Sequence, residues 1–149
     1  MTAKKLKGQT LIEIVLSLGL ATSVIVAIVI LGTATLKTTT SSSRRAEATK
    51  LSSSGVEAIR YLRDSSGFDS VSITCYTISE NNVIKLTDSE CDTSLAWDRI
   101  TLGTNNIFDR KIEVSQYAGT NMKKVTSTVR WQEAGGYRQV VISTVFSKW

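Results

Sequence analysis

The chain contains no histidine and no proline, and only two of its 149 residues are cysteines. Without histidine it lacks the commonest general base, the usual activator of a nucleophile and the usual nitrogen ligand of metals. Two cysteines that lie sixteen residues apart do not form a metal site. We therefore expect a protein that is not an enzyme and that has no metal and no cofactor.

One acidic stretch could suggest calcium, because Asp88, Glu90 and Asp92 alternate along the sequence. A calcium loop of this type needs a central glycine and a closing glutamate, and neither is present. A solvated acidic loop is the preferred interpretation.

Charge is scarce near the N-terminus, where residues 14–36 form 23 consecutive uncharged positions. A helix of this length spans roughly 35 Å, enough to cross a bilayer core of about 30 Å. Lys4, Lys5 and Lys7 precede it and favour a cytoplasmic N-terminus, with the rest of the chain exported. A removed signal peptide would have a shorter apolar region of about 7 to 15 residues, so a retained membrane anchor is favoured.

The net charge of +5 owes much to these first lysines, because basic and acidic residues nearly balance from Lys37 onward. No strongly basic domain remains, and we expect no specific nucleic-acid partner.

Glu13 is an acidic residue at the very start of the apolar run. A carboxylate in a membrane helix costs about 2.5 to 3.5 kcal/mol at the bilayer centre and less near an end, so it usually marks a partner or a function. The plain alternative is a side chain that snorkels to interfacial water.

The residues that follow the anchor are rich in serine and threonine, which is also typical of flexible linkers. Apolar or small residues nevertheless recur at steps of three and four, which predicts a helix with one apolar stripe. The stripe consists of Ala48, Leu51, Gly55, Ala58 or Ile59, and Leu62. We expect one long helix from about Thr10 to about Asp64, ended by Ser65, Ser66 and Gly67.

Beyond residue 68 the pattern changes to β-branched and aromatic residues with partial alternation, which predicts strands. The expected strands are residues 71–78, 83–87, 111–117, 124–131 and 137–146, with turns at 118–121 and 133–136. Residues 88–106 are expected to form an ordered loop without regular structure. The predicted fold is α+β, with the apolar stripe of the long helix packed on a C-terminal antiparallel sheet.

The first thirty residues closely resemble the type IV prepilin signature, because a short basic leader and Gly8 precede "QTLIE" and a long apolar helix. In that family a membrane aspartyl peptidase cuts after the glycine and methylates the new terminal amine. The resemblance implies cleavage between Gly8 and Gln9, with methylation at Gln9. It also implies a leader at 1–8, a transmembrane and polymerisation helix at 9–36, an amphipathic helix at 37–67 and a β-rich extracytoplasmic head at 68–149.

In this family the glutamate is thought to meet the terminal amine of a neighbouring subunit, a role that would fall to Glu13. The implied partners are a prepilin peptidase, other pilin subunits, the pilus assembly platform and the membrane. The implied location is a single-pass membrane protein that later joins a filament at the cell surface.

Gln9 stands where the family usually has phenylalanine or another apolar residue, and many major pilins have a helix proline that this chain lacks. Both features favour a minor pilin or a pseudopilin. The alternatives are a pseudopilin of a type II secretion system and a membrane-anchored extracytoplasmic binding module that does not polymerise.

Cys75 and Cys91 both lie after the anchor, where an oxidising compartment would permit a disulfide. We expect them to be joined. Two separate thiols are the alternative, because a bond requires Cα atoms within about 7 Å of each other.

Overall fold

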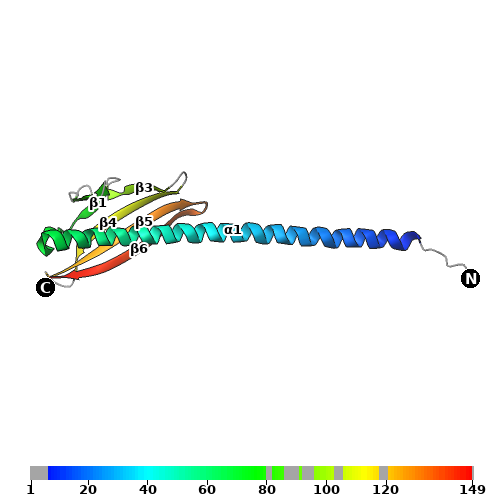
Figure 1. Ribbon diagram of the computed structural model, residues 1–149, viewed down its shortest axis with the longest axis horizontal. Coiled ribbons are helices and arrows are strands. Elements are labelled where there is room, and N and C mark those ends of the chain that lie inside the picture. Colours follow the sequence, from blue (N-terminus) through cyan, green and yellow to red (C-terminus); the bar gives the residue numbers. More distant parts are fainter. Residues whose placement is uncertain are drawn as a thin grey trace, which may run out of the picture. The chain divides into compact units, whose positions relative to one another are not determined.

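The structure is a computed structural model that describes residues 7–79, 82–85, 91, 96–102, 106–117 and 121–148. It has one long helix, α1 (Lys7–Ser66), one turn of 3-10 helix, η1 (Phe68–Ser70), and an antiparallel sheet. The strands are β1 (Cys75–Ser79), β2 (Asn82–Lys85), β3 (Asp98–Leu102), β4 (Asn106–Gln116), β5 (Met122–Glu133) and β6 (Gly136–Ser147). The predicted α+β fold is confirmed (Figure 1).

The chain divides into two compact units, Met1–Ser42 and Ser43–Trp149. The first unit contains the apolar part of α1. The second unit contains the end of α1, the 3-10 turn and all six strands of the described residues, and it is called the head below.

Helix α1 ends where glycine permits a left-handed backbone. Gly67 follows the last helical residue with a φ of 89°, and its amide donates to the Arg63 carbonyl at 2.8 Å. A side chain would be strained at this φ, whereas glycine adopts it without penalty. The helix therefore ends at Ser66, two residues beyond the predicted Asp64, and Gly67 is the one of the three predicted end residues that lies outside it.

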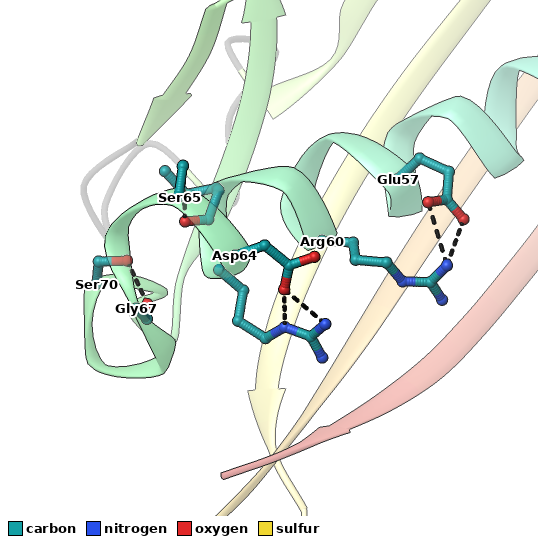
Figure 2. Close-up of polar contacts among 8 residues, drawn as sticks. Glu57, Arg60, Asp64, Ser65, Gly67 and Ser70 are labelled. Atoms are coloured by element: carbon teal, nitrogen blue, oxygen red, sulfur yellow. Dashed lines mark hydrogen bonds and ion pairs between the residues drawn. The ribbon is translucent and has the colours of Figure 1, made fainter. Parts of the chain in front are cut away.

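Exposed polar contacts line the last turns of α1 (Figure 2). Glu57 pairs with Arg60 at 2.8 Å, and Arg63 pairs with Asp64 at 2.7 Å. Beyond the helix end, the Ser70 hydroxyl donates to the Gly67 carbonyl at 2.6 Å. Surface ion pairs of this kind contribute less than about 1 kcal/mol each, so they adjust this end of the helix more than they stabilise the head.

The strands follow the order β2-β1-β4-β5-β6, and β3 pairs with the first half of β4. The predicted C-terminal meander is confirmed, because β4, β5 and β6 are consecutive antiparallel neighbours. The turn between the last two strands lies within the predicted 133–136, and the register closes at Glu133 opposite Gly136.

The prediction of a loop without regular structure over 88–106 was wrong in part. Strand β3 lies inside it, and β4 begins at Asn106, five residues before the predicted start. In β3 only Ile100 is both apolar and paired with a buried residue, Phe108, so the local pattern is too weak to indicate a strand. Strand β3 therefore depends on its pairing with β4 and not on its own sequence pattern.

The head has a core between α1 and the inner face of the sheet. Two hydrophobic clusters fill it, and their buried aromatic members are Tyr76, Phe108, Trp131 and Phe146. The buried stripe of α1 is turned slightly from the predicted one. Ser52 and Val56 are buried, whereas Leu51 and Leu62 are only half-buried.

The stripe shifts because α1 approaches the sheet most closely at small residues. A Cβ at Gly55 would lie 2.6 Å from Ser127 Oγ and 3.2 Å from Ile112 Cδ1. One turn earlier, the Ser52 hydroxyl donates to the Ser127 carbonyl at 2.8 Å. Glycine and two serines therefore set the distance between helix and sheet, and a hydroxyl takes a central place that hydrophobic periodicity would not indicate.

We expect Gly55→Ala to lower the free energy of unfolding by about 1 to 2 kcal/mol, although alanine favours helix more than glycine does. The reason is the contact with Ser127 Oγ, which would have to move. Denaturant unfolding of the detergent-solubilised chain measures the effect. Gly32→Ala is the matched control, because an added Cβ there meets nothing within 4 Å.

A double variant tests the cause. The Ser127 hydroxyl oxygen is buried and has no hydrogen-bond partner, so Ser127→Ala alone should cost little. In the Gly55→Ala background it should restore part of the lost stability, and strictly additive effects would contradict the proposed contact.

Candidate functional site

The described part of the first unit is helical, and its surface is largely apolar and exposed from Leu11 to Leu36. Side chains from Leu11 to Leu36 have exposed fractions near 60%, and the most apolar window of the helix has a mean hydropathy of 2.8. By length and composition this stretch could cross a membrane. Glu13 is exposed and lies between the apolar Ile12 and Ile14.

Hydroxyl groups inside the apolar stretch bond to their own helix. Ser17 donates to the Ile14 carbonyl at 2.9 Å, and Thr33 donates to the Ile30 carbonyl at 2.9 Å. Thr22, Ser23 and Thr35 make the same kind of bond with carbonyls three or four residues earlier. Such bonds satisfy hydroxyls where no water is available, which suits this helix to lipid. Among these polar groups, only the Glu13 carboxylate carries a charge.

Gly8 and Gln9 lie at the beginning of α1, which starts at Lys7. Their side-chain surroundings lie outside the described residues, so cleavage and methylation at these positions stay predictions. Gln9 and Glu13 are four residues apart on one helix, which places them on the same face. An amine at the start of a chain cut here would therefore lie about one turn from the carboxylate.

The predicted disulfide is confirmed. Cys75 and Cys91 are bonded, and their Cα atoms are 5.4 Å apart, within the usual range for a disulfide. Cys75 is fully buried at the start of β1, where it lies opposite Glu113 of β4. The bond links Cys91 to β1, the strand between the edge strand β2 and β4. The acidic positions 88, 90 and 92 lie outside the described residues.

A buried arginine joins α1 to β3 and was not predicted from the sequence. Arg110 donates from Nη2 to Asp98 Oδ2 at 2.7 Å and from Nη1 to Ser54 Oγ at 3.1 Å. Its side chain is only 7% exposed. It lines an open groove of about 610 Å³ between α1 and β3, together with Leu51 and Ile100. Asp98 neutralises the guanidinium, and Arg99, the other cation that lines the groove, pairs with Asp109 at 3.3 Å. Neither lining arginine is therefore left without an anionic partner.

A second cation closes the segment after α1. Lys123 Nζ donates to the carbonyls of Phe68 at 2.9 Å and Val71 at 2.6 Å, and it lies 4.2 Å from the centre of the Phe68 ring. Burial lowers the pKa of the Lys123 ammonium group. Nearby, Lys148 pairs with Asp69 at 2.7 Å and lowers the pKa of that carboxyl group. These contacts stabilise a turn and leave no reactive group.

On the outer face of the sheet, an arginine is held between two aromatic rings. Arg130 Cζ lies 3.8 Å from the Trp97 ring centre and 5.2 Å from that of Tyr137. Its Nε donates to Asp109 Oδ2 at 3.3 Å, and Arg99 pairs with the other oxygen of Asp109 at 3.3 Å. Both cations pair with the one carboxylate of Asp109, so neither is unpaired, and the cluster keeps one excess positive charge.

Across the described ranges, no group of three or more histidine, cysteine, aspartate or glutamate residues is placed to hold a metal ion. The features with potential function are therefore the charged start of the apolar helix and the surfaces of the head. Comparison with protein-family models, with curated proteins and with solved structures finds no match for this chain.

Proposed function

We propose that the chain is a structural subunit of a type IV pilus-like filament, most similar in kind to a minor pilin. In this proposal a prepilin peptidase cuts after Gly8 and methylates Gln9, and α1 then inserts into a bundle of subunit helices. The sequence "GQTLIE" at 8–13 motivates the cleavage step. The head remains outside the membrane, with other pilin subunits and an assembly platform as partners.

The observation that carries the proposal is the position of Glu13. It is a charged and exposed residue on a stretch of helix that is otherwise uncharged and exposed through Leu36. A lone carboxylate is costly in lipid, but a neighbouring amine in the same low-dielectric layer would offset much of that cost. The start of a cut chain would supply such an amine, because it lies one turn from Glu13 on every subunit.

The first test is the N-terminus of the protein purified from membranes. Intact-mass measurement should show a chain that begins at Gln9, with one added methyl group where methylation occurs. Gly8→Leu should accumulate as an uncut precursor, because the peptidase site would no longer have its glycine. Gly32→Leu is the matched control and should be processed normally, since that position is remote from the cleavage site and open in the structure.

Two outcomes would contradict the proposal. A wild-type chain that begins at Met1 would show that no leader is removed. A chain that begins near Leu36 would show a removed signal peptide and no retained anchor. A chain that starts at Gln9 but never enters filaments would instead favour the membrane-anchored binding module.

A further inference from the structure

Strand β6 is a long edge of the sheet, and no strand of the described residues pairs with its outer side. It forms the last strand in the order, and its register with β5 runs without a bulge from Glu133 opposite Gly136 to Met122 opposite Ser147. Natural proteins usually protect such edges with lysine, proline, bulges or short strands. From Gln139 to Ser147, β6 has no charge and no proline. This stretch is therefore a template for another strand.

The hydrogen-bond phase shows which residues face the open edge. The Lys148 amide donates to the Asn121 carbonyl at 2.9 Å, one position beyond the last paired residues of β5 and β6. Ladder bonds alternate along an antiparallel pair, so the even-numbered residues of β6 bond to β5. The odd-numbered residues direct their amides and carbonyls to the open edge.

The same odd-numbered residues carry an exposed apolar row on the outer face. Tyr137 is 65% exposed, Val141 is 52% exposed and Val145 is 43% exposed. These three residues are spaced four apart, with Val141 in the centre. The row is therefore evenly spaced about Val141, so an antiparallel second copy can place each apolar residue of the row opposite another apolar residue of the row.

We propose that β6 pairs antiparallel with β6 of a second copy of this chain, about a two-fold axis at Val141. In this register Val141 lies opposite itself, and Tyr137 lies opposite Val145 of the second copy. Arg138 lies opposite Thr144, so no like charges meet. This register pairs odd-numbered residues with odd-numbered residues, as their outward-facing amides and carbonyls require.

The helices do not obstruct this pairing. Helix α1 crosses the sheet at β5, where Ser52 bonds to Ser127. From β5 to the axis is one and a half strand spacings, which separates the two helices by roughly 14 Å. Packed helices approach to about 8 to 10 Å, so both fit on the inner face.

The two-fold symmetry also fixes the relative direction of the two paired chains. A two-fold axis perpendicular to the sheet reverses the direction of the helix that lies on it, so the two copies of residues 43–66 run in opposite directions. Resting on the proposed function, the pairing would join subunits of two antiparallel filaments and not neighbours in one filament. The strand pairing itself does not depend on that function.

Cysteine cross-linking of the full chain in detergent tests the register. Val141→Cys should give a cross-linked dimer with a short thiol cross-linker, because opposite Cα atoms would lie about 5.5 Å apart. Gln139→Cys and Ser143→Cys are matched controls on the same face. Each alone would place its cysteines roughly 14 Å apart and should give at least about tenfold less dimer. Mixed together, these two variants should cross-link, because residue 139 would lie opposite residue 143. The native cysteines are bonded to each other and do not interfere.

A proline variant separates edge pairing from contact through the membrane helices. A single strand pair is smaller than the usual stable interface, so the chain should be tested at high concentration. Ser143→Pro removes an outward amide and leaves the ladder with β5 intact. In the Val141→Cys background it should abolish the dimer while the Cys75–Cys91 bond and the circular dichroism spectrum persist.

The proposal is overturned if all three single cysteine variants cross-link equally, or if the dimer survives Ser143→Pro. The uncut Gly8→Leu chain should show the same cross-linking pattern as a chain with the wild-type Gly8. Loss of cross-linking would therefore leave the filament proposal standing, and loss of processing would leave the strand pairing standing.

Discussion

Glu13→Val is expected to keep membrane insertion and to abolish incorporation into filaments. Removing the carboxylate makes the isolated helix easier to insert, by up to about 2.5 to 3.5 kcal/mol at the bilayer centre and less near its edge. In the assembled bundle, however, the terminal amine of the neighbouring subunit would lose its partner. Breaking a buried ion pair by removing one partner costs about 3 to 5 kcal/mol, more than the gain on insertion at the membrane edge.

The measurement is the amount of each variant in sheared filaments relative to the membrane fraction. Glu13→Asp keeps the charge on a shorter side chain and should retain part of the assembly. Glu57→Val is the matched control, because Glu57 is an acidic residue of the same helix that forms only an exposed pair with Arg60. Normal recovery of Glu13→Val in filaments would remove the assigned role of this carboxylate.

Helix α1 shows how much of a helix can be predicted from hydrophobic periodicity in the sequence. An apolar run and an amphipathic stripe predicted one helix that ends near Gly67, and the structure has it from Lys7 to Ser66. The helix face was predicted less well, because Ser52 and Gly55 occupy its centre. Only a small residue fits there, because the sheet approaches the helix closely at Ser127. Ser127 belongs to β5, which is far from the helix in the sequence. Hydropathy along the helix holds no information about that distance.

The sheet shows which strands the sequence pattern cannot predict. The long strands β4, β5 and β6 have enough alternation to be predicted, whereas β3 depends on pairing with β4 and was not predicted. Arg110 was missed for the same reason. Its partner Asp98 lies twelve residues away and becomes adjacent only when β3 pairs with β4. A single charged residue in a strand is normally predicted to face solvent. Only the fold shows that the side chain of Arg110 is buried.

The surface of β6 was also beyond sequence reasoning. Its residues predicted a strand, but whether a strand lies at the edge depends on the order of the sheet. The phase of its free hydrogen-bonding groups depends further on the register with β5. Only these two facts together show that Tyr137, Val141 and Val145 belong to an exposed apolar row whose amides and carbonyls face the open edge.

Reducing the Cys75–Cys91 bond is expected to lower the stability of the head by about 3 kcal/mol, because the bond closes a loop of about seventeen residues in the unfolded chain. For a domain of this size the loss corresponds to a fall of about 10 to 20 °C in the midpoint of thermal unfolding. The near-ultraviolet signal of the head tryptophans follows this transition in the detergent-solubilised chain, where the apolar helix remains folded.

Reduced wild-type protein is the cleanest comparison, since it loses the bond and keeps every side-chain atom. Cys75→Ala/Cys91→Ala should be slightly less stable than reduced protein, because Cys75 is fully buried and its removal leaves a small void. Cys91→Ala alone should resemble the reduced protein, because Cys91 is only half-buried. A midpoint that moves by less than about 3 °C on reduction would show that β1 and the segment at Cys91 hold together without the bond. In that case other contacts of the head would keep the two Cα atoms 5.4 Å apart, and the disulfide would add little to its stability.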